Sequence, residues 1–136
     1  MTHPIVDLQG ALVLALRADA QMTALVGADG VFDAPPPLRS PPYVTIARHD
    51  LLARDGDTTP GHEHRVLFHV WADDASRKAA LAIVERIVAV SLATDLESAA
   101  LKVTLRRHER TDTAIDAQSG KARAAVAMSF FSEPNA

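Results

Sequence analysis

Residues 63–94, EHRVLFHVWADDASRKAALAIVERIVAVSLAT, decide the fold, because they contain the clearest strand and the longest helix that the sequence predicts. From Glu63 to Trp71 the side chains alternate as a strand requires. Apolar residues occur at both parities, and this pattern allows both faces of the sheet to be partly covered. One face carries Val66, Phe68 and Val70, and the other carries Arg65, Leu67, His69 and Trp71.

A helix follows this strand, from Arg77 to about Thr94. Ser76 is a favourable N-cap, and Asp74 places a negative charge near the helix N-terminus. A broad apolar stripe predicts that this helix covers the sheet. The stripe consists of Ala80, Ile83, Val84, Ile87, Val88 and Ser91, whereas Arg77, Lys78, Glu85 and Arg86 face away.

The N-terminal part of the chain predicts a helix from about Ile5 to Ala18, with Pro4 in its first turn. A helical turn from Ala20 to Leu25 follows, and Gly27 stops it. Next comes a short extended segment, Val31-Phe32. The chain therefore enters the sheet region from a helical N-terminal part.

Five prolines lie between residues 35 and 42. Such a segment cannot be a helix or a central strand, because proline lacks an amide donor and fixes its φ angle. We interpret it as a stiff loop that leads into the next strand. The alternative is a polyproline ligand for an adaptor domain.

Three further strands complete the pattern, at Tyr43–Ala53, Leu101–Arg110 and Lys121–Phe131. Residues 54–62 and 112–120 are polar connections, which we interpret as long arms beyond the sheet. The order of elements predicts an α+β domain. Its antiparallel sheet has about four strands, and an N-terminal helix and a central covering helix pack on one face. No linker is visible, so we expect residues 1–136 to form a single domain.

The composition argues against several classes of protein. No cysteine is present, which excludes disulfides, thiolate metal sites and cysteine nucleophiles. The 14 basic and 17 acidic residues give a net charge of −3, unlike the basic excess of most nucleic-acid-binding proteins. The N-terminus lacks the features of a signal peptide, and no apolar run approaches the length of a membrane span. We therefore expect a soluble protein that does not bind a membrane.

The histidines suggest a metal site, which the spacing does not support. His62 and His64 would share one face of their strand, with Glu63 on the other. Two ligands do not make a structural zinc site, which needs four. We expect histidines at the surface or half-buried, bonded to water or backbone. Three others lie on the opposite face or on possible neighbouring strands: His69, His49 and His108.

No catalytic constellation is recognisable in the sequence. The serines are scattered, and none lies in a nucleophile elbow. The chain has only six glycines and contains no glycine-rich phosphate loop. The carboxylate pairs Asp73-Asp74 and Asp55/Asp57 both lie at turns. We therefore predict a protein that is not an enzyme and has no cofactor.

A basic run, Arg106-Arg107-His108-Glu109-Arg110, lies on the strand that follows the central helix. Strand alternation predicts that residues 106, 108 and 110 project from one side, with Arg123 of the next strand near them. The run could be a charged edge that discourages aggregation. It could also contact an acidic partner or DNA phosphate. The net negative charge favours a protein partner over DNA.

Taken in order, the motifs resemble those of the tail terminator (tail-completion) proteins of long-tailed phages, prophages and phage-like gene transfer agents. The resemblance covers nearly the whole chain, and it depends on the order and spacing of segments that are weak singly. These segments are Asp7–Leu12 (DLQGAL), Leu16–Asp19 (LRAD), Met22–Gly27 (MTALVG), Val31–Asp33 (VFD), Pro42–Ile46 (PYVTI), His69–Ala72 (HVWA) and Ser76–Ala80 (SRKAA).

The resemblance implies a small α+β subunit that forms a ring, usually a hexamer, at the head-proximal end of the tail tube. The ring would end tube polymerisation and join the tail to the head connector. Its partners would be further copies of the chain, the tail tube protein and the connector proteins, with DNA passing through unbound. The protein would occur in the bacterial cytoplasm during assembly and then in the tail or neck of the particle.

Two alternatives remain open. The chain could be another neck protein of the same particle, such as a head-closure or adaptor subunit. It could also be a small metal-binding domain that uses His49, His62 and His64.

Five polar residues are candidates for assembly contacts, because sheet edges and projecting loops can supply the interfaces of a ring. A channel for DNA should carry acidic or neutral side chains, since basic ones would hold phosphate. Asp55, Asp57 and Glu63 are the candidates for that lining. The full set of contact candidates is Asp55, Asp57, Glu63, Asp116 and Ser119.

Overall fold

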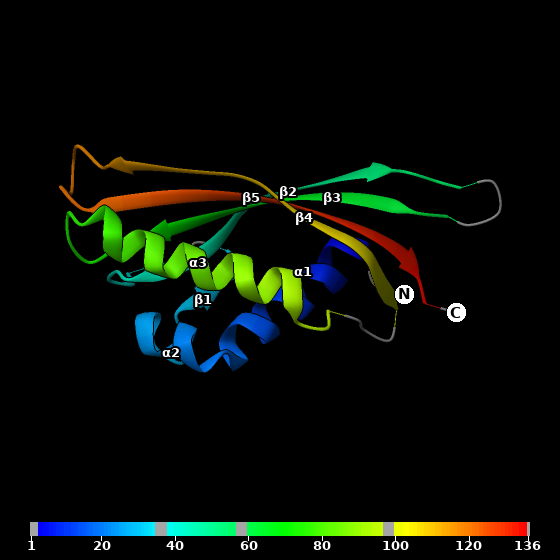
Figure 1. Ribbon diagram of the computed structural model, residues 1–136, viewed down its shortest axis with the longest axis horizontal. Coiled ribbons are helices and arrows are strands. Elements are labelled where there is room, and N and C mark those ends of the chain that lie inside the picture. Colours follow the sequence, from blue (N-terminus) through cyan, green and yellow to red (C-terminus); the bar gives the residue numbers. More distant parts are fainter. Residues whose placement is uncertain (1–2, 35–37, 57–59, 97–99, 136) are drawn as a thin grey trace.

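The computed structural model describes residues 3–34, 38–56, 60–96 and 100–135. Three helices lie on the same side of one five-stranded sheet (Figure 1). The predicted α+β class, with the helices on one face, is confirmed. The elements are α1 (Pro4–Ala18), α2 (Ala20–Val26), β1 (Val31–Phe32), β2 (Tyr43–Ala53), β3 (His62–Trp71), α3 (Arg77–Ala93), β4 (Leu101–Ile115) and β5 (Ala122–Pro134).

The strands follow the order β1-β2-β3-β5-β4, and all neighbours are antiparallel except β1 and β2. The expected count of about four strands is one too low. The additional strand is Val31–Phe32, which pairs in parallel with Val44 and Thr45 of β2. Its two residues carry little periodicity, so the sequence showed only an extended segment.

The helix boundaries follow the capping residues. His3 Nδ1 accepts a hydrogen bond from Ile5 N at the start of α1, where Pro4 occupies the first turn. Ser76 Oγ accepts from Ala79 N at 3.2 Å and caps α3, as predicted. Asp74 accepts from Ser76 N at 2.8 Å and so orders the approach to this cap.

The core lies between the helices and one face of the sheet. α1 contributes every fourth residue, and α3 contributes the predicted apolar stripe. The strand face that meets them is apolar at alternate positions of β3 and β5. The core residues of these four elements include Leu8, Leu12, Leu16, Val66, Phe68, Val70, Ile83, Val84, Ile87, Val126, Met128 and Phe130.

β4 differs most from the sequence expectation. It continues five residues beyond Arg110, and register shifts occur between Val103 and Leu105 and between His108 and Arg110. Each shift is a bulge that inserts a residue and reverses the alternation. Arg106 therefore lies opposite Phe130 and Arg110 lies opposite Ala127, on different faces of the sheet. The expectation that residues 106, 108 and 110 share one side is wrong.

The connection between β4 and β5 is correspondingly short. The first four residues of the predicted polar segment 112–120 belong to β4, and the turn occupies residues 116–121. Asp116 Oδ2 accepts from Ser119 N at 2.9 Å, and Gly120 N donates to Asp116 O at 2.8 Å. Gly120 has a φ of 70°, which glycine adopts without strain.

Candidate interaction surface

The helices cover one face of the sheet, and we call the other face, over β2, β3, β5 and β4, the open face. Its side chains are those at the odd positions of β3 and β5 and the residues paired with them. Apolar and charged groups alternate across it. Its members include Arg48, Asp50, Leu52, Glu63, Arg65, Leu67, His69, Trp71, Arg107, Arg110, Asp112, Arg123, Ala127, Ser129 and Phe131.

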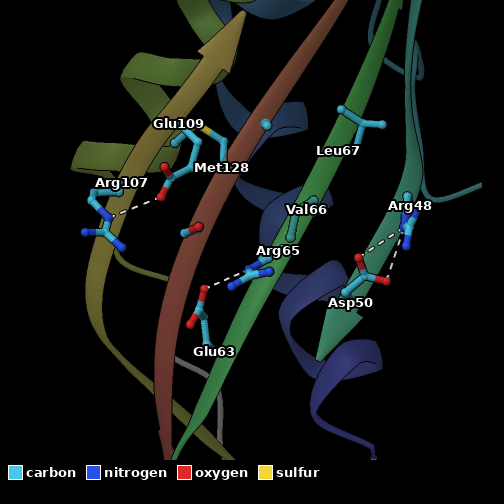
Figure 2. A pocket seen from close by; sticks show the side chains of 11 residues that line it. Arg48, Asp50, Glu63, Arg65, Val66, Leu67, Arg107, Glu109 and Met128 are labelled. Carbon is cyan, nitrogen blue, oxygen red and sulfur yellow. Dashed lines mark hydrogen bonds and ion pairs between the residues drawn. The ribbon is translucent and has the colours of Figure 1, made fainter. Parts of the chain in front are cut away.

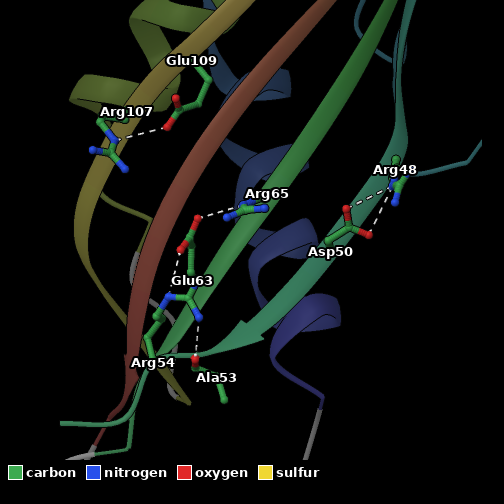
Figure 3. A network of polar contacts seen from close by, with 8 residues as sticks. All are labelled: Arg48, Asp50, Ala53, Arg54, Glu63, Arg65, Arg107 and Glu109. Carbon is green, nitrogen blue, oxygen red and sulfur yellow. Dashed lines mark hydrogen bonds and ion pairs between the residues drawn. The ribbon is translucent and has the colours of Figure 1, made fainter.

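Charged residues on the open face form pairs along individual strands (Figure 3). Arg48 Nε donates to both carboxylate oxygens of Asp50, at 3.2 and 3.0 Å. Arg107 Nε lies 3.2 Å from Glu109 Oε1. These partners are two residues apart, so the same strand holds both on one face. Each pair is exposed and contributes little to stability.

Glu63 is the exception, because its side chain is only 8% exposed. One of its carboxylate oxygens accepts a hydrogen bond from Arg65 Nε at 2.9 Å, and the other lies 3.2 Å from Arg54 Nε. The hydrogen bond from Arg65 holds the pKa of Glu63 below its usual value, and the charges of Arg54 and Arg107 act in the same direction. Glu63 thus neutralises arginines on the sheet instead of projecting from a loop.

A pocket of about 390 Å³ lies at the centre of the open face (Figure 2). Its walls carry the paired arginines Arg48, Arg65 and Arg107, and its floor includes Ala127 and Ser129 of β5. The small residues of β5 leave a depression because the longer side chains of β3 and β4 rise on both sides. Such a pocket can receive one side chain from another molecule.

The opposite face of the sheet contains a chain of hydrogen bonds between buried and half-buried polar groups. Gln9 Nε2 lies 3.2 Å from His49 Nδ1, and His49 Nε2 lies 2.8 Å from His64 Nδ1. His64 Nε2 in turn lies 2.8 Å from Ser132 Oγ. His64 is fully buried, so the expectation of surface or half-buried histidines bonded to water or backbone is wrong for this residue.

The histidine chain is held in its neutral form. Burial lowers the pKa of His49 to about 4. Burial, reinforced by the nearby His49, lowers the pKa of His64 to about 3. The ring nitrogens that a metal would use bond to protein groups instead. Among the described residues, no three His, Asp or Glu side chains are placed to hold a metal ion.

The other predicted contact residues lie in the two connections. Asp55 is exposed and accepts from Gly61 N at 3.1 Å, which closes the loop after β2. Asp57 lies outside the described residues. Asp116 and Ser119 bond to each other in the turn before β5. Backbone bonding to Ser119 lowers the pKa of Asp116. The structure does not bring Asp55, Asp116 and Ser119 together with Glu63 into one site.

The residues around the pocket were missed from the sequence, apart from Glu63. Strand alternation could have placed Arg65 and Glu63 together, but the neighbours of β3 were unknown. The bulge between Ile46 and Arg48 also sets which face Arg48 occupies. Without the strand order, Arg107 and Ser129 could not be assigned to the same depression.

Comparisons with known proteins identified a family and similar solved structures. The family model described as Tail completion protein gp17 matches residues 10–130. A chain from a structure titled "Virion of native gene transfer agent (GTA) particle" is 26% identical, with a TM-score of 0.82. The alignment covers 97% of this chain and 99% of that one. A search of curated proteins found no match. None of the helices in the described part of the chain is both long and apolar enough to cross a membrane.

Proposed function

Because the chain belongs to the tail completion protein gp17 family, we propose that it caps the head-proximal end of a tail tube as a ring. The ring ends tube polymerisation and joins the tail to the head connector. It contains several copies of the chain, six in the form that the resemblance implies, and acts as a structural component and not as an enzyme. The near-complete alignment with a chain of a gene transfer agent virion carries this proposal.

The geometry is consistent with a subunit whose surfaces serve assembly. A ring needs two different surfaces on each copy, because head-to-tail contacts close by rotation. The chain has an uncovered sheet face on one side and a helical layer on the other (Figure 1). DNA passes through the ring without specific binding, and assembly takes place in the bacterial cytoplasm before the ring becomes part of the particle's neck.

The test is to delete the gene that encodes this chain and to measure the length of the resulting tails by electron microscopy. We expect tails of irregular and excessive length that lack heads, because nothing stops the tube or connects it. Tails of normal length without heads would instead support the alternative, a head-closure or adaptor subunit. Normal complete particles would contradict both functions.

A second test addresses the loop between β2 and β3. Deleting residues 55–60 should leave the fold intact, because the pairing of β2 with β3 ends at Ala53 and His62, and should abolish finished particles. Far-UV circular dichroism checks the fold, and particle yield checks assembly. A second variant, in which a two-residue turn replaces residues 117–119, tests the connection between β4 and β5 in the same way. Normal yield from the first variant would exclude a role for Asp55 and Asp57 in assembly.

A further inference from the structure

We propose that a second copy of this chain docks on the open face, with one of its carboxylate side chains in the pocket between Arg48, Arg65 and Arg107. The inference rests on the proposed ring, and it specifies which surface of each copy receives the next. The sequence candidates for assembly contacts did not include these three arginines.

The arginines around the pocket retain hydrogen-bond donors. In each of their ion pairs the donor is Nε, to Asp50, Glu63 or Glu109. Within the described residues, no hydrogen bond occupies the terminal nitrogens of Arg48, Arg65 and Arg107. The intrachain carboxylates therefore hold each guanidinium in place and leave its outer edge free. That edge is the part which binds a carboxylate through two parallel hydrogen bonds.

The floor of the pocket carries a further polar group. Ser129, which is 3% exposed, lines the pocket and carries a hydroxyl group. A carboxylate that enters between the arginines can accept from this hydroxyl as well. The apolar surface that Leu67 and Ala127 contribute to the pocket suits the methylene groups of a Glu or Asp side chain.

The distribution of charge identifies the partner as another copy. Seven basic and five acidic side chains lie on the open face, if Arg54 is included through its contact with Glu63. The rest of the described residues include seven basic but ten acidic side chains. One surface of the molecule is therefore basic and the remainder is acidic, so two copies attract each other when different surfaces meet. The basic members are Arg48, Arg54, Arg65, Lys102, Arg107, Arg110 and Arg123, and the acidic members are Asp50, Glu63, Glu109, Asp112 and Glu133.

DNA fits this surface less well than protein does. Phosphates favour a continuous basic surface, whereas here a carboxylate lies next to nearly every arginine. The open face also has apolar groups, including Leu105, which is 49% exposed. Mixed apolar and charged groups of both signs are typical of contacts between proteins.

The experiment measures self-association of the full chain by sedimentation equilibrium at low and high salt. We expect association that weakens as salt rises. Arg107→Glu and Arg48→Glu, on opposite walls of the pocket, should each weaken it about tenfold or more, because each places a like charge against the docking carboxylate. Circular dichroism and thermal unfolding establish that both variants fold.

Arg77→Glu is the matched control, since it makes the same charge change on an exposed residue of the helical layer. It should not weaken association, because it adds to the acidic surface. A chain that is monomeric at every concentration would overturn the proposal, as would wild-type association of both pocket variants or equal weakening by Arg77→Glu. Gel-shift measurements with duplex DNA provide a further check. Binding of DNA that both pocket variants abolish, with self-association unchanged, would overturn the proposal in favour of DNA.

The proposed function and the proposed docking surface can be contradicted independently of each other. A monomeric chain that still controls tail length would overturn the docking surface and leave the capping function standing. A chain that associates through the open face, yet leaves tails normal when it is removed from the particle, would do the reverse.

Discussion

His64 is the residue whose environment the sequence predicted least well. Its pattern on β3 placed it correctly on the same face as His62, but a surface or half-buried position was expected there. The structure buries it completely, between His49 and Ser132. These partners are 15 and 68 residues away in the sequence, so no local pattern contains them. Only the packing of three strands against α1 produces this arrangement.

The buried histidines should make the protein sensitive to acid. Their pKa values fall from 6.5 in the unfolded chain to about 4 for His49 and about 3 for His64 in the folded protein. Below pH 6.5 the unfolded chain binds protons that the folded protein does not, so stability is complete above this pH and is lost as pH falls. Each histidine contributes a slope of about 1.4 kcal/mol per pH unit down to roughly its folded pKa.

Urea unfolding between pH 7 and pH 4.5 measures this slope. Replacing His64 with Gln should reduce the slope by up to about 1.4 kcal/mol per pH unit, because it removes one of the three histidines, His49, His64 and His69, whose pKa values are lowered by burial. The absolute stability of this variant also changes, but the slope is the informative quantity. His108→Gln is the control, since its side chain is exposed on β4, and it should keep the wild-type slope. An unchanged slope in the His64 variant would contradict the account.

Among the elements, α2 depends on a single carboxylate. Asp19 Oδ2 accepts from Met22 N at 2.9 Å and so caps this seven-residue helix. The same side chain binds Arg86 of α3 through two hydrogen bonds, of 3.0 and 2.8 Å. The bond from Arg86 holds the pKa of Asp19 below its usual value. Asp19 therefore joins the start of α2 to the middle of α3.

Asp19→Ala should lower the free energy of unfolding by about 2 kcal/mol, because it removes both the cap and a partly buried ion pair. Asp19→Asn should cost about half as much, since asparagine caps a helix equally well. Urea unfolding at pH 7 compares the two. Asp29→Ala removes an ion pair whose carboxylate is 79% exposed and should cost less than about 0.5 kcal/mol. Equal costs for Asp19→Ala and Asp29→Ala would contradict the assigned role of Asp19.

The elements also show where sequence periodicity is informative. β2 begins and ends where it was predicted, because turn-forming residues stand on both sides of it. β4 was predicted five residues too short, because Asp112 and Thr113 appear polar enough for a loop. In the structure they continue an edge strand, where exposed polar residues are common. The residue types of β4 do not indicate where its bulges lie. These bulges nevertheless determine which arginines share a face.

At the scale of the whole molecule, alternation and helix periodicity were sufficient for the class and the placement of the helices. Two long apolar helix stripes and one mainly apolar face per strand can be buried together in only a few ways. The open face was harder to interpret, because its mixed residues fit either a solvent-exposed surface or a docking surface. Its pocket is lined by four strands, β2, β3, β4 and β5, and β4 and β5 are remote in sequence from the other two. Which residues meet in the pocket is therefore determined by the strand order.

The continuous core predicts that the chain unfolds as one unit. α1 and α3 pack on the same sheet face, and the buried residues form one cluster. Calorimetry should therefore give a single transition whose calorimetric and van't Hoff enthalpies agree. Two separable transitions would show that the N-terminal helices form a unit of their own.

Trp71 gives the open face a built-in optical reporter. It is the only tryptophan in the sequence, and Arg123 lies over its ring, 5.7 Å from the ring centroid. The emission of an indole depends on the water and charges around it, so the tryptophan fluorescence of the unlabelled chain originates from the open face. When another molecule covers this face, the emission wavelength should shift, and the kinetics of assembly can then be followed without any added dye.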